Sequence, residues 1–297
     1  MKKFSIVIAH APNREVEVIK SIKHLDYDKK KYEIILESGY NASENRNKGI
    51  QKSKGEIIAF IDDDAVVHKD LLKNAEDFFK KYEVDIVGGP QLTPRSDKFF
   101  SKMFGAAIET FWCSYKMANR YKRGKLNLNA DELSITSANC FVKKDVFKKI
   151  KGFDTRLWPG EDPEFFSRAK KSGLKIAYSP DLVIYHRRRN NLKAFLKQHY
   201  NYGRVRLKKE WINKENINFI MVIPSIFTIY TILLPIMLIF SWQFSIPIIL
   251  HLMVDILVAI YISFRKNIFY LPFLPFIFFL VHFSYGLGMI KNLFERK

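Results

Sequence analysis

The sequence predicts an α/β fold with a mainly parallel sheet and flanking helices, followed by a C-terminal membrane domain. The front of the chain alternates short strand-like runs with helix-like patterns, which is typical of such a sheet. After residue 218 the chain becomes strongly apolar, and residues 219–290 contain only three formal charges, Asp255, Arg265 and Lys266. Two domains fit the length of 297 residues. We expect them at residues 1–218 and 219–297.

The charge of the chain is concentrated in the front part. Lys and Arg number 49 against 30 Asp and Glu, a formal net charge of +19, and residues 1–218 account for +16 of it. This composition excludes a disordered chain, a coiled coil, a collagen and a simple soluble enzyme. Cys113 and Cys140 are too few for a disulfide framework and fit a reducing compartment.

The elements of the front part follow from its apolar spacing. Residues 4–8 are too short an apolar run for a signal peptide and predict a buried first strand. Further strands are expected over 32–36, 56–61 and 85–87, and helices over 14–24, 45–53 and 71–82. The strand at 56–61 is apolar throughout its middle, so we expect burial on both faces. Ligands of parallel sheets bind at the carboxyl ends of strands, here residues 9–13, 37–41 and 62–64.

An aromatic segment over residues 97–123 differs from the rest of the front part. Its Phe, Trp and Tyr residues have helical spacing and are flanked by Lys and Arg. One interpretation is a helix packed on the sheet. The other is an interfacial helix beside a bilayer, which aromatic and basic residues favour. Both can hold together.

Three apolar stretches, 219–240, 244–263 and 269–290, are each long enough to cross about 30 Å of hydrocarbon as a helix. Basic residues before the first stretch, and Arg265-Lys266 after the second, both favour the cytoplasm. Three full spans then put the basic tail outside, whereas a re-entrant third segment keeps it inside. Asp255 lies within the second stretch, where a helix contact with His251 and a transport role are both open.

Three adjacent carboxylates, Asp62-Asp63-Asp64, follow the buried strand. Neighbouring carboxylates repel one another unless a cation compensates, and hard oxygen ligands suit Mg²⁺ or Mn²⁺ carrying a diphosphate. A solvated acidic turn is the alternative. No paired Cys or His spacing in the sequence indicates zinc chemistry.

Two further motifs carry candidate chemistry. In Gly160-Glu161-Asp162-Pro163, Asp162 can be an N-cap with Pro163 as the first helical residue, and Gly173 ends the helix. A carboxylate held there can also act as a general base. His186, at the end of a strand and before three arginines, can bind metal and phosphate, although a basic loop beside anionic lipid explains the arginines equally well. Arg204 is a candidate clamp for a diphosphate.

The order of these motifs resembles family 2 glycosyltransferases with the GT-A fold, especially membrane-anchored enzymes that build lipid-linked or exported polysaccharides. The resemblance covers residues 3–205. Its most specific parts are 55–64 (GEIIAFIDDD), 137–154 (SANCFVKKDVFKKIKGFD) and 160–168 (GEDPEFFSR).

The resemblance implies a role for each matching position. Asp162, with Glu161 beside it, is expected to be the catalytic base that deprotonates the acceptor hydroxyl, and Asp64 and His186 are expected at the metal. The expected nucleotide-sugar-binding residues are Asn13, Glu37, Arg46, Asp62, Asp63, Gln198 and Arg204. Among them, Asp62 is expected near the ribose, and Glu37 and Arg46 near the nucleobase.

The expected function is inverting transfer of a sugar from a nucleotide-diphosphate donor to a lipid-linked or glycan acceptor, with a divalent metal, Mg²⁺ or Mn²⁺, as cofactor. We expect a multi-pass protein of the cell membrane with its catalytic domain in the cytoplasm, in contact with membrane lipid. The alternatives are a polyprenyl-phosphate monosaccharide synthase and a non-catalytic scaffold of glycan assembly. Charge alone would suggest a nucleic-acid partner, but no nucleic-acid-binding motif is present. The oligomeric state is not specified by the sequence.

Overall fold

The computed structural model describes residues 2–157, 160–213 and 217–295. It divides into two compact units. The sheet unit comprises Met1–Ser96 and Lys116–Arg187, and the helical unit comprises Asp97–Tyr115 and Arg188–Lys297. The chain is therefore divided differently from the boundary expected at residue 218, because two segments of the front part pack with the apolar helices.

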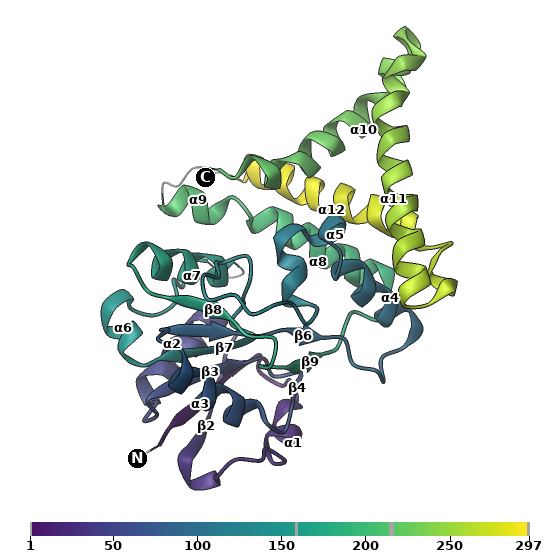
Figure 1. Ribbon diagram of the computed structural model, residues 1–297. Coiled ribbons are helices and arrows are strands. Elements are labelled where there is room, and N and C mark those ends of the chain that lie inside the picture. Colours follow the sequence, from purple (N-terminus) through teal and green to yellow (C-terminus); the bar gives the residue numbers. More distant parts are fainter. Residues whose placement is uncertain (1, 158–159, 214–216, 296–297) are drawn as a thin grey trace. The chain divides into compact units, whose positions relative to one another are not determined.

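A six-stranded sheet forms the centre of the sheet unit (Figure 1). Its strand order is β2-β1-β3-β7-β5-β8, and only β7 runs antiparallel to its neighbours. The strands are β1 (Phe4–His10), β2 (Tyr32–Ser38), β3 (Ile57–Ile61), β5 (Ile86–Gly88), β7 (Asn139–Lys143) and β8 (Ile176–Tyr178). The predicted mainly parallel α/β sheet is confirmed, and all five residues of β3 are buried, as expected.

Each face of the sheet has its own apolar core, because side chains alternate along a strand. Ile6 and Ala59 belong to the core that includes residues of α1 and α3, whereas Val7 and Ile58 belong to the core that includes residues of α6 and α7. The helices of this unit are α1 (Val18–Ile22), α2 (Ala42–Lys52), α3 (Leu71–Lys81), α6 (Asp145–Ile150) and α7 (Glu161–Lys171), with 3-10 turns over Lys29–Lys31 and Tyr115–Arg120.

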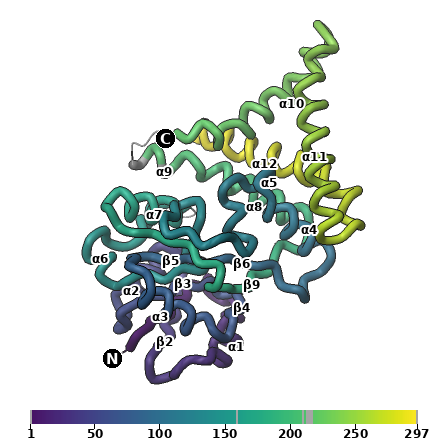
Figure 2. Tube along the Cα trace, in the orientation of Figure 1, coloured from purple at the N-terminus to yellow at the C-terminus, as the bar shows by residue number. Residues whose placement is uncertain are grey.

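A second, three-stranded sheet has the order β4-β9-β6. Its strands are β4 (Ala65–Val67), β6 (Gln91–Leu92) and β9 (Ile184–His186). β4 and β9 are far apart in the sequence but lie side by side (Figure 2), and their antiparallel register pairs Ala65 with His186. This pairing brings His186 next to the residue that follows Asp64.

Two predicted helices differ most from the structure. The helix expected over 14–24 is only Val18–Ile22, because the Val18 N–H donates to the Asp63 carbonyl at 2.9 Å and Asn13 takes a positive φ of 63°. The aromatic segment is broken into α4 (Phe99–Ile108) and α5 (Phe111–Ser114). The break occurs because the Thr110 side chain caps α5 by accepting from the Cys113 N–H at 3.1 Å.

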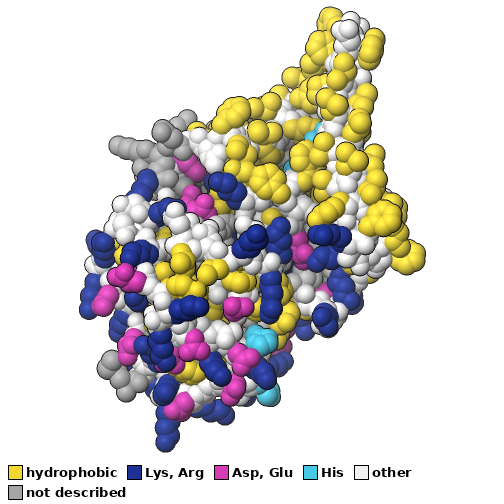
Figure 3. Space-filling model, viewed as in Figure 1, with side chains coloured by type: hydrophobic (Ala, Val, Ile, Leu, Met, Phe, Trp, Pro, Cys, Tyr) yellow, Lys and Arg dark blue, Asp and Glu magenta, His cyan; other side chains and the backbone are white. Residues whose placement is uncertain are grey.

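The helical unit contains three helices that are long and apolar enough to cross a membrane, Phe219–Phe240, Trp242–Arg265 and Leu274–Phe294. Hydrophobic side chains cover the surface of α10 and α11 (Figure 3). The other α-helices here, besides α4 and α5, are α8 (Leu192–Val205), α9 (Lys208–Asn213), α10 (Ile223–Phe240), α11 (Ile246–Arg265) and α12 (Leu274–Phe294), and 3-10 turns cover Phe219–Val222, Trp242–Ser245 and Ile268–Tyr270.

Glycines bring α8 and α12 into close backbone contact. A Cβ atom on Gly203 would lie 2.0 Å from the Tyr285 carbonyl oxygen, and one on Gly288 would lie 1.9 Å from the Tyr200 carbonyl oxygen. Small residues permit this approach, which is typical of membrane helix pairs. α8 is therefore fixed to one of the candidate membrane helices.

Candidate active site

The three adjacent aspartates lie where β3 ends, at the carboxyl edge of the sheet. Asp63 is buried, whereas Asp62 and Asp64 are partly exposed. The Asp62 N–H donates to the Ala138 carbonyl at 3.3 Å, and the Ala65 N–H donates to the Asp62 carbonyl at 3.2 Å. The turn is therefore held to the segment before β7 and is not a freely solvated acidic loop.

His186 faces two of these carboxylates. Its Nε2 lies 3.0 Å from Asp64 Oδ1 and 3.7 Å from Asp62 Oδ2. One ligand atom from each of the three residues lies within 4.8 Å of the others. The β4–β9 pairing produces this arrangement, since it fixes which residue of β9 stands opposite the start of β4.

Arg14 also contacts the aspartates, a contact that was not predicted from the sequence. Its Nη2 lies 2.5 Å from Asp64 Oδ2 and its Nε lies 3.1 Å from Asp63 Oδ2. Arg14 comes from the loop after β1, at the same edge of the sheet as the end of β3. Its guanidinium therefore occupies one oxygen of Asp64, while the other oxygen faces His186.

A buried ion pair joins this cluster to α7. Arg46 Nη1 donates to Glu161 Oε1 at 2.6 Å, and Arg46 Nη2 lies 3.5 Å from Asp62 Oδ1. Arg46 and Glu161 are 7% and 4% exposed, so neither charge is solvated and each depends on the other. Arg46 thus ties Asp62 to the first residue of α7.

Asp162 is held by Ser137. The Ser137 N–H donates to Asp162 Oδ2 at 3.1 Å, and the Ser137 hydroxyl donates to Asp162 Oδ1. The N-cap position belongs to Gly160, with φ at 119°, so the predicted N-cap role of Asp162 and the predicted first-turn start at Pro163 are wrong. Gly160 takes the cap because only glycine adopts this φ readily, and Gly173, also at positive φ, follows the end of α7 as predicted.

Two neighbouring residues connect the halves of the site. Ser137 binds Asp162, and the next residue, Ala138, accepts a hydrogen bond from the Asp62 backbone. Together with the Arg46 contacts, this brings Asp162 and the Asp62–Asp64 turn together at one edge of the sheet. The two acidic motifs therefore belong to one candidate site.

Burial and charge shift the pKa values of these groups in opposite directions. Burial raises the pKa of Asp62, although Arg46 and His186 oppose the shift. Burial, reinforced by Asp64 and Asp62, raises the pKa of Asp63 to about 6. Burial would also raise the pKa of Asp64, but the hydrogen bond and charge of His186, with Arg14, outweigh it and lower the value. Asp64 is therefore the carboxylate most firmly ionised.

Burial also changes the acidity of Glu161, the first residue of α7. Burial raises its pKa to about 7, the neighbouring Asp162 adds to the rise, and Arg46 opposes it. Burial opposes protonation of Arg46, but Glu161, Asp162 and Asp62 raise its pKa further above its ordinary value. The guanidinium is accordingly a permanent positive charge within the site.

A model of the family described as glycosyl transferase family group 2 matches residues 57–291, from β3 to the third candidate membrane helix. The chain belongs to this family. It is therefore a glycosyltransferase, as its motifs predicted.

Named relatives agree with this assignment, and a solved structure has the same fold. Glycosyltransferase AglE of Haloferax volcanii is 27% identical over 173 residues, which are 58% of this chain but only 53% of that protein. The dolichyl N-acetyl-alpha-D-glucosaminyl phosphate 3-beta-D-2,3-diacetamido-2,3-dideoxy-beta-D-glucuronosyltransferase of Methanococcus voltae is 24% identical over 255 residues, 84% of this chain and 74% of that protein. Mannosyltransferase PcManGT from Pyrobaculum calidifontis, solved with GDP-Man and Mn2+, has the same fold, with a TM-score of 0.56, 12% identity, and coverage of 99% and 88% of the two chains.

The glycosyltransferase has a donor set that fits a divalent metal beside β3. Asp64 Oδ1, Asp62 Oδ2 and His186 Nε2 face one another, and His186 Nδ1 is buried without a hydrogen-bond partner among the described residues. Two carboxylates and one imidazole suit Mn²⁺ or Mg²⁺ when phosphate oxygens complete the shell. Asp62 joins Asp64 and His186 as a candidate metal ligand, beyond the two residues expected from the sequence.

The remaining predicted residues lie in other surroundings. Glu37, at the end of β2, is buried and lies 2.6 Å from Lys52 Nζ, and Asn13 is exposed in the loop after β1. Gln198 and Arg204 lie on α8 in the helical unit, where Gln198 donates to the Tyr202 hydroxyl at 2.7 Å and Arg204 Nε donates to Glu295 at 2.7 Å. The nucleotide-binding roles of these four residues stay predictions.

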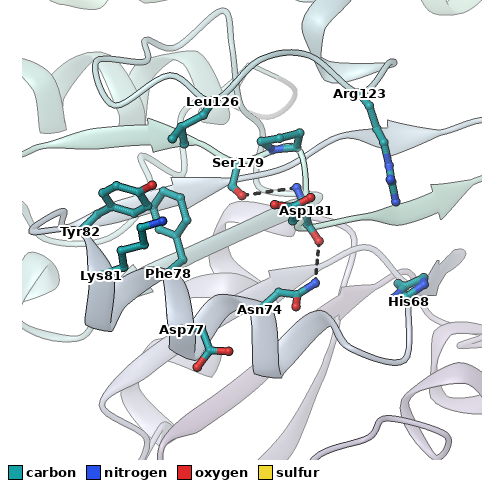
Figure 4. Close-up of a pocket in the computed structure, with 11 residues that line it drawn as sticks. His68, Asn74, Asp77, Phe78, Lys81, Tyr82, Arg123, Leu126, Ser179 and Asp181 are labelled. Carbon is teal, nitrogen blue, oxygen red and sulfur yellow. Dashed lines mark hydrogen bonds between the residues drawn. The ribbon is translucent and has the colours of Figure 1, made fainter.

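A separate cavity of about 410 Å³ lies between α3 and the segment after β8 (Figure 4). Asn74 donates to the Asp181 carbonyl at 3.0 Å across it, and the Asp181 N–H donates to the Ser179 hydroxyl at 3.4 Å. None of the acidic residues at the end of β3 lines this cavity. It is therefore not part of the candidate active site.

Proposed function

We propose that this glycosyltransferase transfers a sugar, with inversion, from a nucleotide-diphosphate donor to a lipid-linked acceptor at the cytoplasmic face of a membrane. The observation that carries the proposal is the position of Asp162, held by Ser137 beside the Asp62–Asp64–His186 cluster. A fixed carboxylate next to a cluster suited to a cation and a diphosphate supports sugar transfer in a single displacement.

Each residue of the site has a defined task in this reaction. Asp64, His186 and Asp62 would hold Mg²⁺ or Mn²⁺, which supplies neutralising charge to the diphosphate when bound. Asp162 accepts the proton of the acceptor hydroxyl, whose oxygen forms the new bond to the anomeric carbon. The bond from that carbon to the diphosphate oxygen breaks, and the electron pair leaves with the nucleoside diphosphate. One displacement inverts the anomeric centre.

Ser137, Arg46 and Glu161 act as positioning residues. Ser137 orients the Asp162 carboxylate through two hydrogen bonds, so that an oxygen lone pair is held in place before the acceptor arrives. Arg46 and Glu161 fix Asp62 from the buried side. Arg14, which contacts Asp63 and Asp64, places a positive charge at the end of the site where the diphosphate would lie.

The names of the relatives support a lipid-linked acceptor. One relative acts on dolichyl N-acetyl-alpha-D-glucosaminyl phosphate, and another, from Haloferax volcanii, is a glucosyl-dolichyl phosphate glucuronosyltransferase that matches 49% of this chain. In both names the acceptor lipid already carries a sugar. This favours extension of a lipid-linked glycan over the alternative in which the enzyme charges a polyprenyl phosphate with its first sugar. Membership of the family favours an enzyme over the non-catalytic scaffold.

The membrane orientation rests on charge. Three helices of sufficient length and apolarity support a multi-pass protein. Arg204, Arg206 and Lys208 precede the first of them, and Arg265-Lys266 follow the second, which favours a cytoplasmic location for both segments. Nucleotide sugar and anionic lipid would then meet the +16 front part on the same side.

The proposal is tested with membranes that contain the full-length enzyme, a panel of radiolabelled nucleotide sugars, and polyprenyl phosphate with or without a first sugar. We expect one donor to label a lipid product whose new linkage has the opposite anomeric configuration to the donor. Asp162→Asn and Asp64→Asn should abolish labelling, and Asp145→Asn, which changes an exposed carboxylate of α6, should not. Full activity of both site variants, or a product with retained configuration, contradicts the proposal.

A further inference from the structure

Three polar side chains meet inside the helical unit, away from the candidate active site in the sequence. His251 and Asp255 lie one turn apart on α11, and His282 lies on α12. His251 Nε2 lies 3.4 Å from Asp255 Oδ2 and 3.4 Å from His282 Nδ1. The Asp255 side chain is 0% exposed, and its Oδ2 accepts no hydrogen bond from the described residues. A buried carboxylate oxygen without a hydrogen bond needs another partner, and here that partner would be a ligand rather than a protein group.

Trp112 of α5 orients two of these three side chains. His282 Nε2 lies 2.9 Å from the Trp112 carbonyl oxygen, which can only accept, so Nε2 carries the proton and Nδ1 keeps its lone pair. The Trp112 indole N–H donates to Asp255 Oδ1 at 2.7 Å, so Oδ2 is left free. Histidine and carboxylate ligands of metals are held by this kind of outer contact.

The third ring is held by packing. His251 stacks on Phe227 of α10, with ring centroids 4.1 Å apart, and its Nε2 faces both of the free atoms. A proton on His251 Nε2 can serve only one of them. If that proton is shared with Asp255 Oδ2, the lone pair of His282 Nδ1 has no partner, and if it is shared with His282 Nδ1, Asp255 Oδ2 has none.

Two of the separations among these three atoms match a tetrahedral metal. With metal–ligand distances of about 2.0–2.1 Å, two ligands of a tetrahedral zinc ion are separated by about 3.3–3.4 Å. The two measured separations are 3.4 Å. Mg²⁺ and Ca²⁺ prefer oxygen-rich shells, whereas two imidazoles and one carboxylate suit zinc or a similar transition metal.

We propose that His251 Nε2, Asp255 Oδ2 and His282 Nδ1 bind one transition-metal ion, preferably Zn²⁺, with water in the fourth position. The ion links α11 to α12, and Trp112 connects two of its ligands, Asp255 and His282, to α5. This site differs in chemistry from the Asp62–Asp64–His186 cluster, which suits Mg²⁺ or Mn²⁺. It does not depend on the proposed function, because none of its residues belongs to the candidate active site.

The test is a cobalt titration of the full-length protein in detergent, purified without a metal column and dialysed against EDTA. Co²⁺ in a four-coordinate nitrogen and oxygen site absorbs in the visible range. We expect these bands to saturate at one Co²⁺ per chain, to disappear on addition of Zn²⁺, and to persist in excess Mg²⁺. Zinc should also raise the unfolding temperature of the unmodified protein.

Variants assign the ion to its site. Asp255→Asn and His282→Gln should lose the bands. Asp64→Asn should keep them, and so should His199→Gln, which removes another buried histidine of the helical unit. Because Asp255→Asn or His282→Gln can fail to fold, the titration of the unmodified protein decides first. Absence of bands and of zinc retention there shows a purely hydrogen-bonded cluster and overturns the proposal. Loss of the bands in Asp64→Asn with retention in a folded His282→Gln also overturns it.

Discussion

Ser137 donates its backbone N–H to one carboxylate oxygen of Asp162, at 3.1 Å, and its hydroxyl to the other. Ser137 comes from the segment before β7, and Asp162 is the second residue of α7. Two hydrogen bonds from one residue fix both the position and the plane of the carboxylate. A general base that is held in this way does not have to reorient before it accepts the proton.

Replacement of Ser137 should therefore reduce the rate of transfer. Asp162→Asn removes the carboxylate that we propose as the base, and we expect a loss of about 10²–10⁴-fold in kcat. Ser137→Ala keeps the base and the backbone hydrogen bond, so kcat should fall by a smaller factor, about ten-fold, with little change in the donor KM. Steady-state kinetics with purified enzyme measure both. An unchanged kcat in Ser137→Ala would show that the hydroxyl has no positioning role, and Ser137→Thr should restore part of the rate.

Removal of Arg46 should destabilise the sheet unit. Arg46→Met leaves Glu161 buried without its partner, which costs about 3–5 kcal/mol for an ion pair of this kind. The unfolding temperature of the purified protein should fall clearly. The double variant Arg46→Met/Glu161→Met removes both charges and should recover part of the loss. If the single and double variants unfold at the same temperature as the unmodified protein, the pair does not stabilise the fold.

Removal of divalent metal should stop transfer, and Mn²⁺ or Mg²⁺ should restore it. His186→Ala takes away one candidate ligand, so the Mn²⁺ concentration for half-maximal activity should rise at least about ten-fold. His68→Ala is the matched control, because His68 lies in the same unit but 3.5 Å from Asp70 rather than in the cluster. Restoration by Zn²⁺ but not by Mn²⁺ or Mg²⁺ would argue against the assignment of the metal at β3.

The stability of the sheet unit should depend on pH through Glu76. The hydrogen bond from the Tyr27 hydroxyl, at 2.7 Å, and the contact with Lys80 lower the pKa of Glu76 from its ordinary value of 4.5. A lowered pKa in the folded state stabilises the fold above pH 4.5, and this contribution is lost as the pH falls through the lowered value. Tyr27→Phe should therefore reduce the unfolding temperature at pH 7 and much less at acid pH, whereas Tyr40→Phe, which alters an exposed ring, should have no effect at either pH. A difference that is constant with pH would show that the hydroxyl acts by packing alone.

Local patterns were sufficient to predict β1, β2, β3 and β5 and the acidic residues that follow β3, but not β7 and β8. The apolar run of β3 and the three aspartates after it are adjacent in the sequence and are recognised together. His186 stands at the end of a segment that was predicted as a strand. Arg14 and Ser137 were missed because their contacts span 50 and 25 residues and lie in loops without periodicity. The N-cap assigned to Asp162 was wrong because the left-handed Gly160 takes the cap position, so the helix starts two residues earlier, at Glu161. On α11 the spacing of His251 and Asp255 is visible in the sequence, but Trp112 and His282 reach them only through tertiary packing.

The reversed direction of β7 determines which of its residues can meet a substrate. The parallel strands place their last residues at the carboxyl edge of the sheet, where the candidate active site lies. β7 places its first residue there, since Asn139 pairs with Ile61 at the end of β3. Ser137 and Ala138 therefore stand at the edge of the sheet where β3 ends, although they come before their own strand in the sequence.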